Sequence, residues 1–400
     1  MTAFLNGDHT CILVRRAGTD CATRRCHRSH VRCEILFAGG MAAQQPSSGQ
    51  NEGLLSTLSK QVDALCGAYT EKMRQLHSML DVEEDSRERT ARQTAAGRAL
   101  WNHVIHDPLA RFLAGESQLR KLQGKMEEAA GSRETAGVML AVRTLWFDGK
   151  IEAALQRWRE GSDCSELARP QVVLLGAGMD TRAYRLKCLE GCVVFEVDLP
   201  KILAFKSALL KCAAGTDKTE EAPCPGGREE EAGAEDLEPY AARVERVAAD
   251  LATEEWWDKL RQAGFNAGED SGAPTIWVLE GLLYYLKDAE ARALLRRISA
   301  SCVTGTLVLA DFMNEFSTHL SSELQTQFYF HSDWPEELLP TLGFFCVRVS
   351  QMGDPDAHFG LINDNPLSLF HRLRHTPRYC RLGPDGSPCR RLFLVQCSVA

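Results

Sequence analysis

Glycines and acidic residues placed after successive apolar runs are the features of this 400-residue sequence that could carry chemistry. Gly176 and Gly178 come directly after the apolar run 172–175, and Asp198 follows the run 193–197. A glycine allows the backbone to approach a ligand without a Cβ atom in the way. An acid at the end of a neighbouring strand is placed to accept hydrogen bonds from ribose hydroxyls. The spacing therefore predicts a site for a nucleoside cofactor.

Two further apolar runs are each followed by an acidic residue. The run 243–249 is followed by Asp250 and Leu251, and the run 275–279 is followed by Glu280. Short apolar runs that alternate with helix-length segments are typical of a doubly wound, mostly parallel α/β sheet. Because the carboxyl ends of parallel strands meet at one edge of a sheet, we expect all of these residues to lie close together there.

A dinucleotide cofactor is the first alternative. Asp198 lies 20 residues beyond Gly178, near the interval expected for an acid that binds the ribose of NAD. However, Thr181 occupies the third glycine position of the GxGxxG motif, and Asp180 would place a negative charge beside a diphosphate. A sulfonium or an ammonium group tolerates that charge, so the sequence disfavours a dinucleotide.

A helical cap is predicted before the sheet, over residues 41–168. Apolar residues recur every three or four positions across 54–80, which predicts one amphipathic helix. Further helices are expected over about 88–106 and 138–158. Arg143 lies among apolar neighbours in the last of these. A guanidinium in such surroundings requires an anion, which is either a ligand or a structural Asp or Glu partner.

The C-terminal part, residues 169–400, is predicted to be the sheet domain that carries the site. Within it, residues 213–239 hold nine acids together with prolines and glycines, which predicts a disordered acidic insertion. The pattern of residues 317–342 predicts a helix in two pieces that is interrupted at Pro335. Two late apolar segments, 344–350 and 392–398, have no crossover helix between them, which predicts an antiparallel hairpin at one sheet edge.

The N-terminal segment, residues 1–40, is rich in arginine, contains no lysine and has few acids. Such a composition predicts a disordered extension or an organelle transit peptide, and a start at Met41 is the plainer alternative. Cysteine and histidine residues also gather in this segment, at Cys21, Cys26, His27, His30 and Cys33. Their spacing fits no standard zinc finger, so we predict no metal site.

The composition narrows the function classes. Lysine plus arginine number 46 against 54 aspartates plus glutamates, a net charge of −8, so we expect no nucleic-acid partner. No apolar run approaches the roughly 18 residues that a membrane helix needs, so we expect no membrane partner. The 15 cysteines are scattered without a CxxC pair, which favours a reducing, cytoplasmic compartment. A plastid or a mitochondrion is the alternative if the first 40 residues are a transit peptide.

Taken in order, the segments around these residues resemble the motifs of a known family. LLGAGMDTRAYRL, VVFEVDLPKILAFKSALL, the Asp250-Leu251 pair, IWVLEGLLYYL and LVLADF are similar to the S-adenosylmethionine-dependent methyltransferases of the leucine carboxyl methyltransferase superfamily. The bacterial-type O-methyltransferase branch is the most similar, and TARQTAAGRALWNHVIHDPLARFL and MLAVRTLWFD resemble its N-terminal cap. The resemblance covers roughly residues 88–350. It implies a Rossmann-like class I methyltransferase fold, an enzyme, and S-adenosylmethionine as the cofactor.

The resemblance implies roles for the residues around the methionine part of that cofactor. Arg143 would hold the carboxylate, a bidentate task that suits a guanidinium. Gly176 and Gly178 would let the backbone close over the methionine part. Glu280 would lie near the methionine amino group or the methyl-transfer centre.

The resemblance likewise implies three residues for the nucleoside part. Asp198 would accept hydrogen bonds from the ribose hydroxyls. Asp250 would accept one from the adenine amine, and Leu251 would pack against the ring.

The methyl acceptor is predicted to be a hydroxyl or a carboxylate oxygen of a small molecule. A carboxylate needs no general base, whereas a hydroxyl would need one, and the nearest candidates are Tyr284, Tyr285, His319 and His331. A protein C-terminal leucine carboxylate is the alternative acceptor. The alternative of another class is a non-catalytic cofactor-binding module that acts through its N-terminal amphipathic helix.

Overall fold

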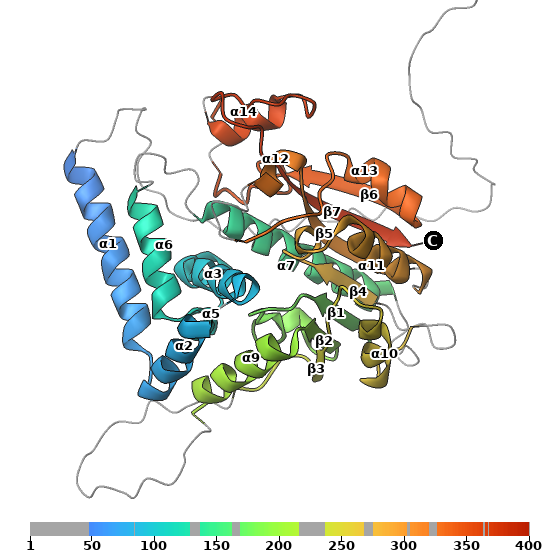
Figure 1. The fold of residues 1–400 in the computed structure, drawn as a ribbon, viewed down its shortest axis with the longest axis horizontal. Coiled ribbons are helices and arrows are strands. Elements are labelled where there is room, and N and C mark those ends of the chain that lie inside the picture. Colours follow the sequence, from blue (N-terminus) through green and yellow to red (C-terminus); the bar gives the residue numbers. More distant parts are fainter. Residues whose placement is uncertain are drawn as a thin grey trace, which may run out of the picture. The chain divides into compact units, whose positions relative to one another are not determined.

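A seven-stranded sheet with helices packed against it makes up the α/β fold of the computed structural model (Figure 1). The structure describes residues 48–83, 85–128, 137–161, 169–215, 237–267, 275–301, 305–319, 326–362, 365–366 and 368–399. All of them belong to one unit, residues 47–400. The arginine-rich N-terminal segment, with its cysteines and histidines, lies outside the described residues, as do residues 216–236 of the acidic insertion.

The sheet is parallel except at one edge, and its strand order is β3-β2-β1-β4-β5-β7-β6. The parallel strands are β1 (Gln171–Leu175), β2 (Val193–Asp198), β3 (Arg243–Ala248), β4 (Thr275–Leu279) and β5 (Leu307–Met313). β7 (Leu392–Val399) pairs antiparallel with β5 and with β6 (Phe344–Gln351). The predicted doubly wound, mostly parallel sheet with an antiparallel edge pair is therefore confirmed. Its order reverses between β1 and β4, which is where open α/β sheets bind ligands.

Helices cover both faces of the central strands, which explains why these strands read as continuous apolar runs. Val172 belongs to the apolar cluster that α7 (Val138–Gly161) builds on one face. Its neighbour Val173 belongs to the cluster that α10 (Glu255–Gln262) and α11 (Asp288–Ala300) build on the other. Every residue of β1 and β4 is buried. Each fully buried valine or leucine contributes roughly 1.5–3 kcal/mol, so these two strands fix the centre of the domain.

The residues before the sheet are helical in the described ranges, but one predicted helix is wrong. The helices are α1 (Ser48–Gly67), α2 (Glu71–Glu83), α3 (Ser86–Leu100), α4 (Asn102–Ile105), α5 (Ala110–Ala114) and α6 (Glu116–Glu128), followed by α7. The single helix predicted over 54–80 is broken between α1 and α2. Tyr69, in the break, is buried, and its hydroxyl donates to the carbonyl of Arg111 in α5. Tertiary packing of this ring therefore overrides the helical periodicity.

α3 is the helix that joins this region to the sheet edge. Asp85 caps its start, since its carboxylate accepts from the backbone N–H groups of Arg87 and Glu88 at 2.8 and 2.9 Å. Near the other end, Gly97 lies against α7, and a Cβ atom there would be 2.1 Å from a methyl carbon of Leu140. A larger residue here would force the Leu140 side chain to move, so a glycine lets the two helices pack closely at this crossing.

The two-piece helix predicted over 317–342 is also wrong. α12 (Glu315–Thr318) and α13 (Pro335–Leu338) are short, and the described residues between them are irregular. Phe330 of that irregular stretch is buried, with its ring centroid 6.1 Å from that of Phe312 in β5. Phe330 thus packs against the sheet from an irregular segment, and Pro335 starts α13 rather than breaking a helix.

The remaining helical elements join the strands, and three of them, α8, α9 and η2, border the site. They are α8 (Arg182–Arg185), η1 (Lys187–Leu189), α9 (Pro200–Ala213), η2 (Leu283–Tyr285), η4 (Leu339–Leu342) and α14 (Leu369–His375).

Candidate functional site

A pocket of about 150 Å³ lies at the carboxyl edge of the parallel strands, between the tips of β1, β2, β3 and β4 and the helices α3 and α7. The seven residues predicted to bind a cofactor all line it: Arg143, Gly176, Gly178, Asp198, Asp250, Leu251 and Glu280. They come from segments far apart in the chain, so it is the sheet topology that brings them together. Their individual roles as cofactor ligands remain predictions.

The turn between β1 and α8 presents backbone to the pocket. Gly176 and Gly178 are left-handed, with φ of +68° and +44°. A Cβ atom on Gly176 would lie 2.9 Å from Leu282, and one on Gly178 would lie 3.3 Å from Ala91 of α3. Both the conformation and the space therefore favour glycine at these positions, and a ligand can approach the bare backbone.

Asp198 lies at the tip of β2 and braces that turn. Its carboxylate accepts from the N–H of Gly178 at 2.6 Å and from the N–H of Leu199 at 2.7 Å. The residue is only 8% exposed, and burial raises the pKa of this carboxyl above its ordinary value. An ionised carboxylate has about four acceptor positions, so two are left for a ligand.

The tip of β3 combines an acid with an apolar surface. Asp250 is exposed and Leu251 is buried in the core that α10 and α11 build, and both line the pocket. The carboxylate of Asp250 accepts from the N–H of Ala252 at 3.0 Å, which fixes its orientation at the strand end.

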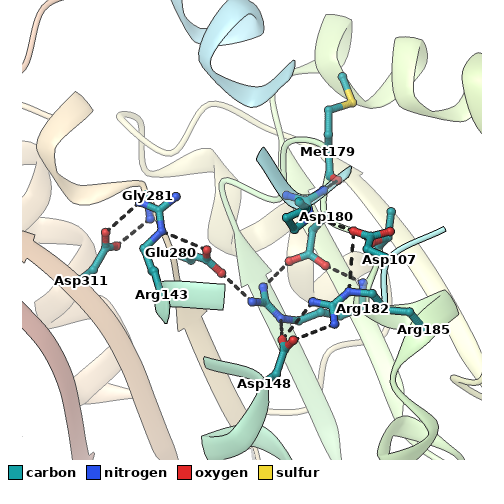
Figure 2. Close-up of polar contacts among 12 residues, drawn as sticks. Asp107, Arg143, Asp148, Met179, Asp180, Arg182, Arg185, Glu280, Gly281 and Asp311 are labelled. Carbon is teal, nitrogen blue, oxygen red and sulfur yellow. Dashed lines mark hydrogen bonds and ion pairs between the residues drawn. The ribbon is translucent and has the colours of Figure 1, made fainter. Parts of the chain in front are cut away.

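Arg143 projects from α7 between carboxylates (Figure 2). Its Nε donates to Glu280 Oε1 at 3.1 Å, and its Nη1 lies 3.3 Å from Asp311 Oδ2 and 3.3 Å from the hydroxyl of Tyr284. The sequence left open whether this arginine meets a ligand or a structural acid. The structure provides two structural acids and also exposes Arg143 to the pocket. Burial by itself acts to lower the pKa of Arg143, but Tyr284 and the two acids outweigh it and raise that pKa.

Arg182 is a second buried arginine of the site, and the sequence reading missed it. Its Nε donates to Asp148 Oδ1 at 2.6 Å and its Nη2 to Glu280 Oε2 at 2.6 Å, while Nη1 pairs with Asp180. Glu280 is therefore shared between two guanidinium groups, as Figure 2 shows. Arg185, one helical turn further along α8, also pairs with Asp148, at 2.7 Å. The local signal was the pair of arginines three residues apart directly after the glycine turn.

Two aspartates of this network, the half-buried Asp180 and the buried Asp311, have opposite pKa shifts. Burial acts to raise the pKa of Asp180, but Arg182, with Lys206 further away, lowers it to about 2. For Asp311, burial dominates and raises the pKa to about 6, because Arg143 and a backbone N–H offset it only in part. Asp180 therefore carries a full charge at neutral pH, and Asp311 titrates near pH 6.

Only two of the four candidate general bases lie at the pocket. Tyr284 and Tyr285 line it, whereas His319 and His331 are exposed and do not. Burial is the main cause that raises the pKa of both tyrosines. The hydroxyl of Tyr285 also donates to Thr90 Oγ1 at 2.8 Å. Both phenols are thus protonated at neutral pH, which makes them hydrogen-bonding groups rather than bases.

Arg87 is the remaining cation of the pocket wall. It is exposed, it lines the pocket from the first turn of α3, and it makes no ion pair with any residue that the structure describes. Its charge acts on both Asp198 and Tyr285, lowering their pKa values slightly. An arginine without an ion-pair partner in the described part of the chain can meet an anionic ligand here.

Two searches of the described residues were negative. No group of three or more His, Cys, Asp or Glu side chains in these ranges is arranged to hold a metal ion. No helix in the same ranges combines the length and the apolar character that a membrane span requires.

Comparison with known sequences matches the family model described as leucine carboxyl methyltransferase to residues 90–299. A protein of Mycobacteroides abscessus is 38% identical over 223 residues, which cover 54% of this chain and 61% of that protein. One of Parafrankia sp. is 39% identical over 181 residues, covering 44% and 46%. Both carry the provisional name of an S-adenosyl-L-methionine-dependent methyltransferase. The chain thus spans about half to two thirds of the length of these curated relatives.

The solved structures that match this chain are less similar to it in sequence than these relatives are. A DUF574 family protein from Streptomyces avermitilis has a TM-score of 0.45 at 12% identity, covering 78% of this chain and 97% of that one. Human N-acetylserotonin methyltransferase, solved in complex with S-adenosylmethionine, has a TM-score of 0.32 at 12% identity, covering 73% and 70%.

Proposed function

This chain belongs to the leucine carboxyl methyltransferase family, and from that membership we propose that it is an S-adenosylmethionine-dependent methyltransferase whose cofactor binds in the pocket at the carboxyl edge of the sheet. One observation carries the proposal: Arg143, Asp198, Asp250 and Glu280 converge on a single pocket around a left-handed glycine turn. That set complements an amino acid at one end of the pocket and a nucleoside at the other.

The amino-acid end fits a zwitterion. A ligand with neighbouring carboxylate and ammonium groups needs a cation and an anion side by side, and Arg143 Nε and Glu280 Oε1 are 3.1 Å apart. Nη2 of Arg143 donates to none of the described residues, so its two N–H groups are available to a carboxylate. The glycine turn lines the same pocket with backbone, since a Cβ atom on Gly176 would lie 2.9 Å from Leu282.

The nucleoside end fits a ribose and a purine. Asp198 keeps two acceptor positions after binding the N–H groups of Gly178 and Leu199. Asp250 and Leu251 offer an acceptor and an apolar surface next to each other. S-adenosylmethionine supplies an electrophilic methyl group when bound there, and the residues of the chain supply its position.

We propose further that the acceptor is a carboxylate. A hydroxyl acceptor would need a base, but Tyr284 and Tyr285 are protonated at neutral pH because burial raises their pKa values. Glu280 is already engaged by two arginines. A carboxylate attacks without losing a proton, and Arg87 is a cation at the pocket that can attract it.

The experiment that tests this proposal has a binding arm and a turnover arm. Calorimetry with S-adenosylhomocysteine should show one site per chain, and a folded protein that does not bind it would overturn the cofactor assignment. Methyl-labelled S-adenosylmethionine is then supplied with aliphatic and aromatic carboxylic acids, with phenols, and with a peptide ending in leucine. A methyl ester releases labelled methanol in mild alkali, whereas a methyl ether does not.

Label that is released by alkali supports the carboxylate, and transfer to the peptide alone would identify a protein C-terminus as the acceptor. Alkali-stable label would overturn the carboxylate assignment while leaving the methyltransferase proposal intact. Binding without turnover on any acceptor would favour the non-catalytic module.

A further inference from the structure

Asp311 is a buried acid that no role described so far uses. It belongs to β5, it is fully buried, and it does not line the pocket. Figure 2 shows it beside Gly281 and the guanidinium of Arg143. A charged group in such a position is costly unless it is paired and hydrogen-bonded, so its contacts need to be identified.

The two oxygens of Asp311 hold two different parts of the amino-acid end of the pocket. Oδ1 accepts from the backbone N–H of Gly281 at 2.6 Å, and Oδ2 accepts from Arg143 Nη1 at 3.3 Å. Gly281 follows Glu280 directly and is left-handed, with φ of +68°. One carboxylate therefore fixes both the guanidinium of Arg143 and the backbone that carries Glu280.

We infer that Asp311 is a positioning residue that sets the arrangement of Arg143 and Glu280 and so determines whether the pocket accepts an amino-acid group. Without the charge of Asp311, Nη1 would keep only the hydroxyl of Tyr284, and the guanidinium would be drawn further toward Glu280, whose Oε2 already binds Arg182. With that charge, only Nε reaches Glu280 and Nη2 is left for a ligand carboxylate. The inference rests on the proposed cofactor site.

For the position of Arg143, the charge of Asp311 matters more than the hydrogen bond that Asp311 accepts from Gly281. A neutral side-chain oxygen could accept from that N–H equally well, but only an anion competes with Glu280 for a guanidinium. Among the described residues, the charged or titratable groups that act on it are Arg143 from α7, Glu280 after β4, and Tyr284 and Tyr285 from η2. Because its pKa is raised to about 6, Asp311 loses its charge on mild acidification, and with it the pull on Arg143.

The test compares two ligands that differ only at the amino-acid end. S-adenosylhomocysteine carries the amino acid, and 5′-methylthioadenosine lacks it. In the full-length Asp311→Asn variant, calorimetry should show a roughly 10- to 100-fold loss of affinity for S-adenosylhomocysteine, the effect of one charge-assisted contact. Affinity for 5′-methylthioadenosine should change less than about twofold, since Asp198 and Asp250 are untouched.

Asp356→Asn is the matched control. Asp356 also braces α7, because it accepts from Trp146 Nε1 at 3.3 Å and pairs with Lys150 at 3.0 Å, but it does not contact Arg143. General loosening of α7 would lower the affinity for S-adenosylhomocysteine in both variants, whereas loss of the position of Arg143 would lower it only in Asp311→Asn. Equal loss for both ligands, or no loss for S-adenosylhomocysteine, would overturn the positioning role.

Wild-type protein provides a second measurement should Asp311→Asn fail to fold. The ratio of the two affinities should fall below about pH 6 as Asp311 becomes protonated, because only S-adenosylhomocysteine depends on Arg143. Protonation of Asp198 changes the affinity for both ligands equally, so it does not change the ratio of the two affinities. A ratio that is constant from pH 5 to pH 8 contradicts the role of Asp311, whereas wild-type protein that binds neither ligand contradicts the proposed cofactor site itself.

Discussion

Replacing Asp198 by alanine tests the nucleoside end of the pocket most directly. The carboxylate accepts from the N–H groups of Gly178 and Leu199 at 2.6 and 2.7 Å, so Asp198→Ala leaves both donors without their partner. An unsatisfied buried donor costs roughly 1–3 kcal/mol. Because water can reach the rim of the pocket, we expect the free energy of unfolding to fall by about 2–4 kcal/mol.

The effect on ligand binding should be larger than the effect on stability. Two ribose hydroxyls that donate to an ionised carboxylate contribute roughly 1.5–3 kcal/mol each. Their loss corresponds to an affinity for S-adenosylhomocysteine that is weaker by about 10²- to 10⁴-fold. Asp198→Asn retains one acceptor oxygen, whereas its amide nitrogen cannot accept a hydrogen bond. That variant should therefore lie between wild type and Asp198→Ala in both measurements.

Calorimetry with S-adenosylhomocysteine gives the affinity, and denaturant unfolding gives the stability of each variant. Asp258→Ala, on the exposed side of α10, is the control for loss of an acidic side chain and should match wild type in both. A folded Asp198→Ala protein that binds S-adenosylhomocysteine as tightly as wild type would refute the ribose assignment.

Three further predictions concern stability. Gly97→Ala would place a Cβ atom 2.1 Å from a methyl carbon of Leu140, so that side chain must change its rotamer, and the free energy of unfolding should fall by up to about 1 kcal/mol. Gly149→Ala, with open space around it, should raise the free energy of unfolding by up to about 1 kcal/mol. Thermal denaturation of the two variants checks the helix crossing. Lys206→Met breaks a fully buried ion pair of 2.9 Å with Glu196, which keeps Arg246 at 2.9 Å, and should therefore cost about 1–3 kcal/mol in denaturant unfolding, less than the roughly 3–5 kcal/mol of an uncompensated buried charge. A cost below about 1 kcal/mol would show that the pair is dispensable. Asp311 has a pKa of about 6 in the fold against an ordinary 3.8, so the folded protein binds more protons between those values and this residue's contribution to stability falls as pH rises from about 4 to 6. Unfolding of Asp311→Asn and wild type across that range should show the variant gaining relative to wild type as pH rises.

The ends of the parallel strands could be predicted from the sequence because their signals are local. An apolar run, a glycine turn or an acid, and a following helix lie within a few residues of one another, as at Gly176 and Asp198. Once the strands are recognised as parallel, their tips must meet at one edge, so the pocket follows from the strand order.

The partners of the buried arginines could not be predicted in the same way. Arg143 meets Glu280 and Asp311, which are 137 and 168 residues away in the chain, and no local spacing encodes such pairings. The sequence therefore left the ligand and the structural acid as equal alternatives for Arg143. Both wrong helices have a related cause, because buried rings such as Tyr69 and Phe330 follow tertiary contacts rather than helical periodicity.

The carboxylate of Glu280, shared between Arg143 and Arg182, has a consequence for which molecules the pocket can select. A ligand with a single positive charge would pair with Glu280 and leave an arginine without its carboxylate. A ligand with a single negative charge would pair with an arginine and leave Glu280 without that cation. A zwitterionic ligand, with both charges on neighbouring atoms, leaves neither the glutamate nor the arginine unpaired. The self-neutralised lining should thus discriminate against simple amines and simple acids at that end, before any contact with the rest of the ligand is made.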